Sequence, residues 1–307
     1  MKSSYQFNRW ICREDSTWAY LVFQKHNSEL TNILLSHLAA SDFTYSTLGK
    51  SFGANYSDDY HKWFKGIKEV KYTPFEKVQD WSDSFNKFKN WTNLNCVVAM
   101  SANLETYMST VISLALESDV GVLYGASQKI DGLLILKYGK KQPTDFKEHL
   151  IGCTKGDWNS RIRYFERIFG STPLVLSNNV ADLEALRILR NNIGHAFGRD
   201  INESRNHEII EISKMASLKT EKLIHFTRLI YKIAKDIDKQ LFFNNIGAYQ
   251  DLCFYHRLRG GLTFNDFNKK RQFGNHVSIL KNKLGQHAAK TSGIEYCKGL
   301  INYYETM

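Results

Sequence analysis

The sequence has very little proline. Pro74, Pro143 and Pro173 are the only prolines among 307 residues. Proline is the residue that most often interrupts long helices, and few segments alternate strictly between apolar and polar residues, as half-buried strands do. Hydrophobic residues make up 43% of the chain and charged residues 23%, which is the balance of an ordinary globular protein. These features predict an all-α fold.

Cysteine is scarce as well, and long apolar runs are missing. The five cysteines are scattered, odd in number and never form a C-x-x-C pair, which indicates neither a disulfide framework nor a zinc site. No run of about eighteen apolar residues occurs, and the N-terminus, MKSSYQFNRWICRED, has no apolar signal core. We therefore expect a soluble, cytoplasmic protein with no membrane segment.

Common enzyme motifs are also absent. The sequence has no Walker-type phosphate loop, no G-x-G-x-x-G after a strand, no G-x-S-x-G and no H-E-x-x-H. The ten histidines show no spacing typical of a metal site. Any catalysis is therefore expected to need neither a metal nor another cofactor.

What the chain does have is positive charge and many aromatic residues. The formal net charge is +10 and the isoelectric point is near 9.2, which favours nucleic acid as a partner. The N-terminal part carries Trp10, Trp18, Trp63, Trp81 and Trp91. Aromatic rings interleaved with lysines can stack on bases, although packing in a core is their more usual role.

Two helices are expected before residue 94. Residues 17–40 have apolar positions at helical spacing, and residues 41–59 are rich in Ser, Gly, Asn and Asp, which predicts a loop. The stretch TPFE then predicts the start of a second helix. Thr73 is the N-cap, Pro74 takes the first helical position, and the Glu76 side chain bonds back to the amide of the cap residue. That helix is predicted to continue through KVQDWSDSFNKFKNW.

The strongest helical pattern begins near Asn95 and ends near residue 118. Six residues of this segment share one face at alternating spacings of four and three, which predicts central packing. They are Val97, Ser101, Leu104, Met108, Val111 and Ala115. Glu105 lies just beside that stripe. It could be the buried partner of an arginine, but we expect a solvated position at the flank.

The rest of the chain is also read mainly as helical. Residues 119–160 could hold short helices or a hairpin, and helices are expected at 157–170 and 178–197. The pattern of residues 209–243 predicts one or two long amphipathic helices. The division that follows is an aromatic-rich helical N-terminal region at 1–93, a helical domain at 94–240 and a small basic helical region at 241–307.

The helix at 178–197 ends on the polar sequence RNNIGH. In this sequence Arg190, Asn191 and His195 suit a phosphodiester, because arginine offers a planar fork to phosphate oxygens and histidine moves a proton near neutral pH. Asparagine can orient either of them. On one helix Asn191 and His195 share a face, whereas Arg190 lies about 140° from His195. The three can therefore converge on one ligand only at a helix end or where two helices meet.

Spacing alone does not make this stretch distinctive. Arg271 and His276 in RQFGNH have the same gap, without an asparagine after the arginine and without an apolar helix before it, so we treat them as coincidence. The asparagine and the apolar approach LEALRIL distinguish RNNIGH. The alternative is structural, because a histidine at a helix C-terminus and an arginine one turn earlier can simply bond the last carbonyls.

The stretch LEALRILRNNIGH resembles the signature of the HEPN superfamily, in which an arginine, often followed by asparagine, precedes a histidine by four to six residues. The order of elements is similar too: a helix with an acidic residue, here Glu105, a variable middle, the motif helix and another long helix. The resemblance covers about residues 94–240. It implies a HEPN-like four-helix bundle core, with additional helical regions on both sides.

The resemblance implies a metal-independent endoribonuclease. His195 would transfer protons, Arg190 would hold the phosphate and Asn191 would position them, while Arg187 and Arg199 are the expected RNA-binding residues. Two motifs would pair across a homodimer, and the 2′-hydroxyl of the RNA would attack the adjacent phosphate. Such proteins act as toxins or effectors in bacterial or phage defence and in toxin–antitoxin systems, so an antitoxin or a sensor protein is a further expected partner.

The sequence departs from the pattern of some HEPN toxins at one position, and two alternative functions remain open. Some HEPN toxins carry a tyrosine two residues after the histidine, where nucleotides are attached, and this chain has Phe197 there. The protein could be a non-catalytic HEPN-like module that binds RNA or a protein partner. It could also be a regulator that binds DNA through its basic C-terminal helices.

Overall fold

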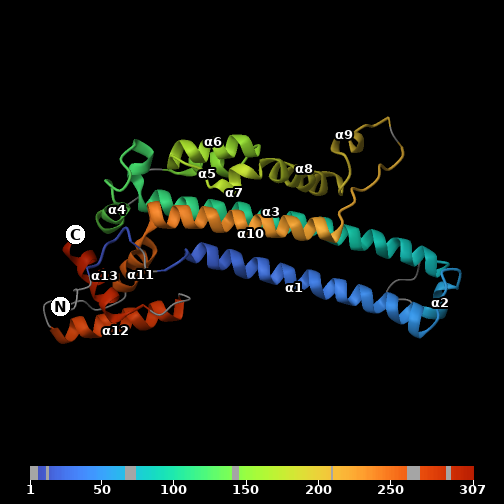
Figure 1. Ribbon diagram of the computed structural model, residues 1–307, viewed down its shortest axis with the longest axis horizontal. Coiled ribbons are helices and arrows are strands. Elements are labelled where there is room, and N and C mark those ends of the chain that lie inside the picture. Colours follow the sequence, from blue (N-terminus) through green and yellow to red (C-terminus); the bar gives the residue numbers. More distant parts are fainter. Residues whose placement is uncertain are drawn as a thin grey trace. The chain divides into compact units, whose positions relative to one another are not determined.

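The fold is helical throughout the part of the chain that the structure describes. The computed structural model describes residues 6–11, 14–65, 74–139, 145–208, 210–260, 270–287 and 292–307, without the side chains of 270–272. In these ranges every regular element is a helix (Figure 1), and strand-like pairing is limited to the isolated bridges Asp59–Lys77 and Asp119–Asp131. The predicted all-α class is confirmed.

The chain forms two compact units, and each unit is built from separate stretches of sequence. Unit 1 contains Met1–Phe23, Glu105–Val180 and Lys232–Met307. Unit 2 contains Gln24–Leu104 and Ala181–Tyr231. This division follows contacts between distant segments, whereas the expected regions 1–93, 94–240 and 241–307 follow the order of the sequence.

Three long helices contribute residues to both units. They are α1 (Trp18–Ser46), α3 (Val78–Ser118) and α10 (Thr220–Leu241). None of them contains glycine or proline, so nothing in the backbone interrupts them. The loop expected at 41–59 was wrong in its first part, because α1 continues to Ser46 and a turn of π-helix follows at Thr47–Ser51.

The helix α3 replaces two separate helices that we expected on either side of residue 94. It begins at Val78 rather than at Pro74, and Thr73 lies outside the described residues. The carboxylate of Asp80 accepts hydrogen bonds from the amides of Glu76 (3.1 Å) and Lys77 (2.9 Å), which are left unpaired by the first turn. A cap inside the helix therefore takes the place of the predicted cap before it.

The polar stretch in the middle of α3 does not break the helix. Asn95 donates to the carbonyl of Trp91 (2.8 Å), and Thr92 donates to the carbonyl of Phe88 (3.0 Å). These side chains bond back to their own helix instead of competing with it. The apolar stripe that follows is buried as predicted, since Val97, Ser101, Leu104, Met108, Val111 and Ala115 are all at most 8% exposed.

Glu105, beside that stripe, is not the solvated flank residue that we expected. Its carboxylate lies 3.2 Å from the guanidinium of Arg161 and 3.2 Å from the ammonium of Lys155. The Arg161 side chain is only 5% exposed, so the carboxylate balances the charge of a buried arginine. The stripe pattern could not show this, because Arg161 comes from a distant helix.

Unit 1 also contains several short helices. The described parts of 119–160, namely 119–139 and 145–160, form short helices and not a hairpin. The additional elements are η2 (Val120–Tyr124), α4 (Gly132–Tyr138), α5 (Lys147–Thr154), α6 (Trp158–Phe169), α7 (Leu174–Asn178), the π-turn η3 (Phe242–Ile246), α11 (Tyr249–Gly260), α12 (Lys270–His287) and α13 (Ile294–Thr306). The predicted helix at 157–170 is thereby confirmed as α6. It is capped by Asp157, whose carboxylate accepts from the amide of Ser160, and it ends at Gly170, which has a φ of 76°.

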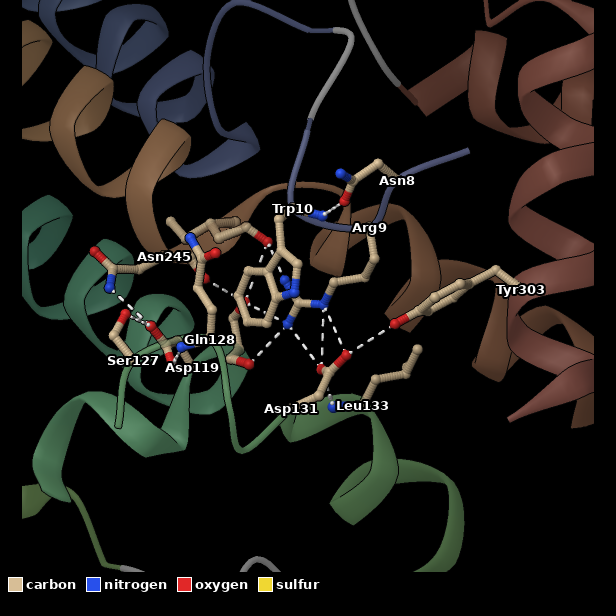
Figure 2. A network of polar contacts seen from close by, with 12 residues as sticks. Asn8, Arg9, Trp10, Asp119, Ser127, Gln128, Asp131, Leu133, Asn245 and Tyr303 are labelled. Carbon is tan, nitrogen blue, oxygen red and sulfur yellow. Dashed lines mark hydrogen bonds and ion pairs between the residues drawn. The ribbon is translucent and has the colours of Figure 1, made fainter. Parts of the chain in front are cut away.

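A buried arginine joins four parts of unit 1. Arg9 is 1% exposed, and its guanidinium donates to the Asp131 carboxylate (2.9 and 3.1 Å), to the Ser118 carbonyl (2.7 Å) and to the Ile246 carbonyl (3.0 Å). Figure 2 shows this network, with the Trp10 ring 3.6 Å from the guanidinium carbon and the Tyr303 hydroxyl donating to Asp131. The network is internally satisfied, which indicates a structural role.

A second polar cluster lies beside it. In Figure 2 the buried Asp119 carboxylate accepts from the hydroxyl of Ser127 (2.6 Å), the amide of Gln128 (2.8 Å) and the side chain of Asn245 (3.0 Å). These bonds hold Gln128 at a φ of 62°, a left-handed conformation that a residue with a side chain rarely adopts. The cluster therefore fixes an irregular turn against η3.

Unit 2 contains fewer additional elements. They are α2 (Tyr60–Trp63), α8 (Val180–Ala196) and α9 (Ile201–Ser204). The helix predicted at 178–197 corresponds to α8. The helix predicted from residue 209 begins only at Thr220, because the described part of 206–219 is irregular.

Candidate functional site

The sequence RNNIGH lies in the last turns of α8. The apolar face of this helix is buried at Leu183, Leu186 and Ile193. Arg190 and Asn191 are half-buried, and His195 is exposed. Packing of one face therefore presents the polar end of α8 to solvent.

Arg190 and Asn191 contact each other directly. A guanidinium nitrogen of Arg190 donates to the side-chain oxygen of Asn191 at 3.1 Å. This bond restricts the arginine, whose long side chain would otherwise sample many rotamers. His195 lies one turn beyond Asn191 on the same helix face, and within the described part of the chain its ring has no hydrogen-bond or ion-pair partner. The ring is available to a ligand.

The end of α8 is shaped by two residues with left-handed backbone. Phe197 has a φ of 55° and Gly198 a φ of 78°. The amide of Gly198 donates to the carbonyl of Asn192 (3.0 Å), and its carbonyl accepts from the amide of Ala216 (2.7 Å). A Cβ atom at Gly198 would lie 3.0 Å from Leu94 and 3.2 Å from Met215, so a side chain there would crowd two neighbours as well as being strained by the positive φ. The chain thus turns sharply two residues after His195.

The two arginines expected to bind RNA already have partners within unit 2. Arg187 donates through its Nε to the carboxylate of Glu184 at 2.9 Å. Arg199 donates through its Nε to the carbonyl of Ser213 at 2.8 Å, and its guanidinium carbon lies 5.1 Å from the Phe197 ring centroid. A guanidinium has five N–H donors, and this contact uses one of those on Arg199.

Two asparagines of α3 hold the irregular segment that follows the motif. Asn90 donates to the carbonyl of Ala216 (2.8 Å) and accepts from the amide of Leu218 (2.9 Å), as a neighbouring strand would. Asn93 donates to the carbonyl of Leu218 at 3.0 Å. Reasoning from the sequence missed this clamp. The signal was present in KNWTNLN, since asparagines are unfavourable inside helices unless their side chains bond elsewhere.

Phe197 ends the helix expected at 178–197, but α8 ends at Ala196 and the Phe197 side chain is 54% exposed. Its ring centroid lies 6.2 Å from that of Trp91 on α3. The left-handed backbone at Phe197 turns the side chain out of the helical repeat, which a periodic pattern could not anticipate. The end of α8 therefore combines a cation, a histidine and two aromatic rings.

The chain matches no protein-family model, no curated protein and no solved structure. The HEPN resemblance therefore depends on the motif and on the order of helices. Among the described helices, none combines the length and the apolar character needed to cross a bilayer. In the same ranges no three His, Cys, Asp or Glu side chains gather where they could hold a metal ion.

Proposed function

We propose that the protein is a metal-independent endoribonuclease of the HEPN type. The observation that supports this most is the end of α8, where a restrained Arg190–Asn191 pair and an exposed His195 lie within two turns. This arrangement supplies a cation for phosphate oxygens and a group for proton transfer. It also lies at the end of a helix, where a ligand can approach from several sides.

The proposed reaction needs no component beyond RNA and these side chains. The 2′-oxygen of a ribose forms a bond to the adjacent phosphorus, and the bond from phosphorus to the 5′-oxygen breaks. His195 takes the proton of the 2′-hydroxyl or gives one to the leaving 5′-oxygen, while Arg190 binds the phosphate oxygens as negative charge develops. The products are a 2′,3′-cyclic phosphate and a 5′-hydroxyl.

The proposal includes a homodimer with a composite site. The regular helix through Ala196 keeps Arg190 and His195 about 140° apart. A second copy can bring its own arginine and histidine to the same phosphate, so that one histidine acts as base and the other as acid. Arg187 and Arg199 are proposed to hold neighbouring phosphates.

The order of helices also supports the HEPN assignment. A long helix (α3) is followed by short helices, the motif helix α8 and the long helix α10, which is the order described for a HEPN four-helix core within 94–240. We further propose that the protein acts as a toxin or effector in bacterial or phage defence or in a toxin–antitoxin system. An antitoxin or a sensor protein would then control it. Since Phe197 stands where some HEPN toxins have tyrosine, that control would not use nucleotide attachment at this position.

The test is an RNA cleavage assay in EDTA with the full-length protein. We expect the wild type to cut mixed cellular RNA, and His195→Ala and Arg190→Ala each to slow cleavage by at least about 100-fold. His207→Ala is the matched control, because His207 is an exposed histidine of the same unit outside the motif. Its rate should equal that of the wild type. The new 3′ ends should carry 2′,3′-cyclic phosphates and the new 5′ ends should carry hydroxyl groups.

Two outcomes would contradict the proposal. One is equal cleavage by the wild type and the two motif variants, which would assign any activity to a contaminant or to another site. The other is a strict monomer in sedimentation equilibrium at assay concentration. RNA binding without cleavage by the wild type would instead favour the non-catalytic RNA-binding module.

A further inference from the structure

A row of aromatic side chains runs along α3 in unit 2. Trp81, Phe85, Phe88 and Trp91 follow each other at spacings of four, three and three residues, which places them on neighbouring positions of one helix face. Successive ring centroids lie 5.1, 6.2 and 6.1 Å apart. The row continues to Phe197, whose centroid is 6.2 Å from that of Trp91.

The two ends of the row differ in exposure. Trp81 also contacts Phe64 and Tyr45, with centroids at 4.6 and 5.6 Å, so this end is packed. At the other end Phe88 is 46% exposed and Phe197 is 54% exposed, with the half-buried Trp91 between them. We call Phe88, Trp91 and Phe197 the aromatic platform. Two of these three rings are about half exposed, although Phe88 also meets the His37 ring with centroids 5.3 Å apart, and contiguous exposed aromatic surface marks a candidate binding site.

Basic residues adjoin the platform residues in the sequence, and one of them contacts a platform ring. Lys87 is exposed and Lys89 is half-buried on either side of Phe88 in the sequence. The Arg199 guanidinium lies over the Phe197 ring, 5.1 Å from its centroid. The acidic residues of this part of α3, Asp80 and Asp83, lie before Phe85 in the sequence, toward the packed end of the row. Rings with flanking cations match the bases and phosphates of a nucleic acid strand.

We propose that the aromatic platform binds the bases of single-stranded RNA next to the phosphate held by the motif. The inference rests on the proposed function for its choice of RNA, and on continuity with the motif, since Phe197 follows His195 by two residues. Bases in a duplex are stacked and paired, so their faces are closed to side chains. The substrate class is therefore unpaired RNA, read by stacking with little preference for sequence.

The test measures RNA binding by the full-length His195→Ala protein, so that the probe stays intact. The probe is a fluorescein-labelled oligouridylate of about twelve nucleotides, which suits the usual size of such sites. Phe88→Ala in this background should weaken binding about 5- to 100-fold, because one stacking partner is lost. Phe88→Tyr keeps a ring and should bind within about twofold of the parent. Phe43→Ala removes a ring that is 71% exposed outside the row, and should change nothing.

The same measurements with a duplex of equal length give the specificity. We expect duplex RNA to bind more weakly and to be insensitive to Phe88→Ala. Equal oligouridylate binding by Phe88→Ala and its parent would overturn the proposal. So would a Phe88→Ala protein that binds RNA normally but changes its sedimentation, because the platform would then contact a second copy of the chain.

The outcome is separable from that of the proposed function. If neither the wild type nor the His195 and Arg190 variants cut RNA, the catalytic proposal fails while the loss of binding in Phe88→Ala still stands. If those variants are inactive and Phe88→Ala binds normally, the platform alone is rejected.

Discussion

The carboxyl group of Asp251 is buried, and its two oxygens differ in their hydrogen bonding. It is 1% exposed, and Oδ2 accepts a hydrogen bond from the Tyr296 hydroxyl at 2.6 Å. Oδ1 has no partner in the described part of the chain. Burial raises the pKa of Asp251 to about 6, against the opposing effect of the Tyr296 hydrogen bond. The folded protein therefore holds this proton over a pH range in which an unfolded chain releases it.

This difference makes stability fall with rising pH. The contribution of Asp251 is fully present below about pH 4, where both states are protonated, and is lost between about pH 4 and pH 6 as the unfolded state ionises first. Relative to Asp251→Asn, the wild type should lose up to about 3 kcal/mol of unfolding free energy over that window and nothing further above it. Urea unfolding of both proteins from pH 4 to pH 8 measures the difference. Parallel profiles would show that Asp251 does not titrate in this way.

The role of a single residue in the site could be predicted only where that role depends on neighbours in the sequence. The asparagine after Arg190 was recognised from the sequence, and the structure places its oxygen on that arginine. The contact of Glu105 with Arg161 and the clamp that Asn90 makes on Ala216 were not predicted, because these partners lie 56 and 126 residues away along the chain. Exposure of Phe197 depends on a positive φ that no periodic pattern encodes.

At the scale of one element, α8 and the turn after it contain two glycines in different conformations, one with room for a side chain and one without. Gly194 lies inside the helix, where an added methyl group would meet no neighbouring side chain within 4 Å. Gly198 follows the helix at a φ of 78°, and a methyl group there would meet Leu94 at 3.0 Å. Glycine inside a helix costs roughly 0.5–1 kcal/mol relative to alanine. Glycine at a positive φ avoids a strain of similar or larger size.

The two alanine substitutions should therefore act in opposite directions. Gly194→Ala is expected to raise the free energy of unfolding by about 0.5–1 kcal/mol, and Gly198→Ala to lower it by about 1–2 kcal/mol. Each variant is the control for the other in urea or thermal unfolding. A stabilised Gly198→Ala protein would mean that the turn after Phe197 is not held as described. The RNA cleavage proposed for the motif should survive Gly194→Ala, since the added methyl group meets no other side chain.

Elements were predicted well where apolar spacing was continuous and poorly where it was not. The stripe from Val97 to Ala115 and the helices α6 and α8 agree with the sequence prediction. The break expected before Asn95 does not exist, because the side chains of Thr92 and Asn95 bond within the helix. Polar composition was mistaken for an interruption, although no glycine or proline was present.

At the scale of the whole molecule, the C-terminal residues belong to the core of unit 1. Tyr249, Leu252, Leu280, Leu300 and Ile301 are at most 1% exposed. The Ile246 carbonyl and the Tyr303 hydroxyl complete the network around Arg9 and Asp131. These residues therefore cannot be removed as an independent basic region, whatever they contribute to binding.

Deleting residues 241–307 should abolish the cooperative unfolding of unit 1. Its remaining segments would expose the surface that those helices cover, and Arg9 would lose a buried partner. Thermal unfolding followed by circular dichroism, together with limited trypsin digestion, checks this. Lys283→Ala is the control for charge, since this lysine is exposed and its loss should leave unfolding unchanged. A truncated protein with a sharp transition in every segment would show that the C-terminal region folds apart from the rest.

Because each unit is built from separate stretches of sequence, neither can fold until its last stretch has been synthesised. Arg9 donates to the carbonyl of Ile246, which is 237 residues further along. At about 5–20 residues per second, a ribosome needs roughly 10 to 50 s to deliver that acceptor. Unit 2 is likewise incomplete until Tyr231 has been synthesised. Unit 2 can therefore assemble only after Tyr231 has been synthesised, and unit 1 only after the segment that begins at Lys232 has followed, so a nascent chain that stalls before Tyr231 can assemble neither of them.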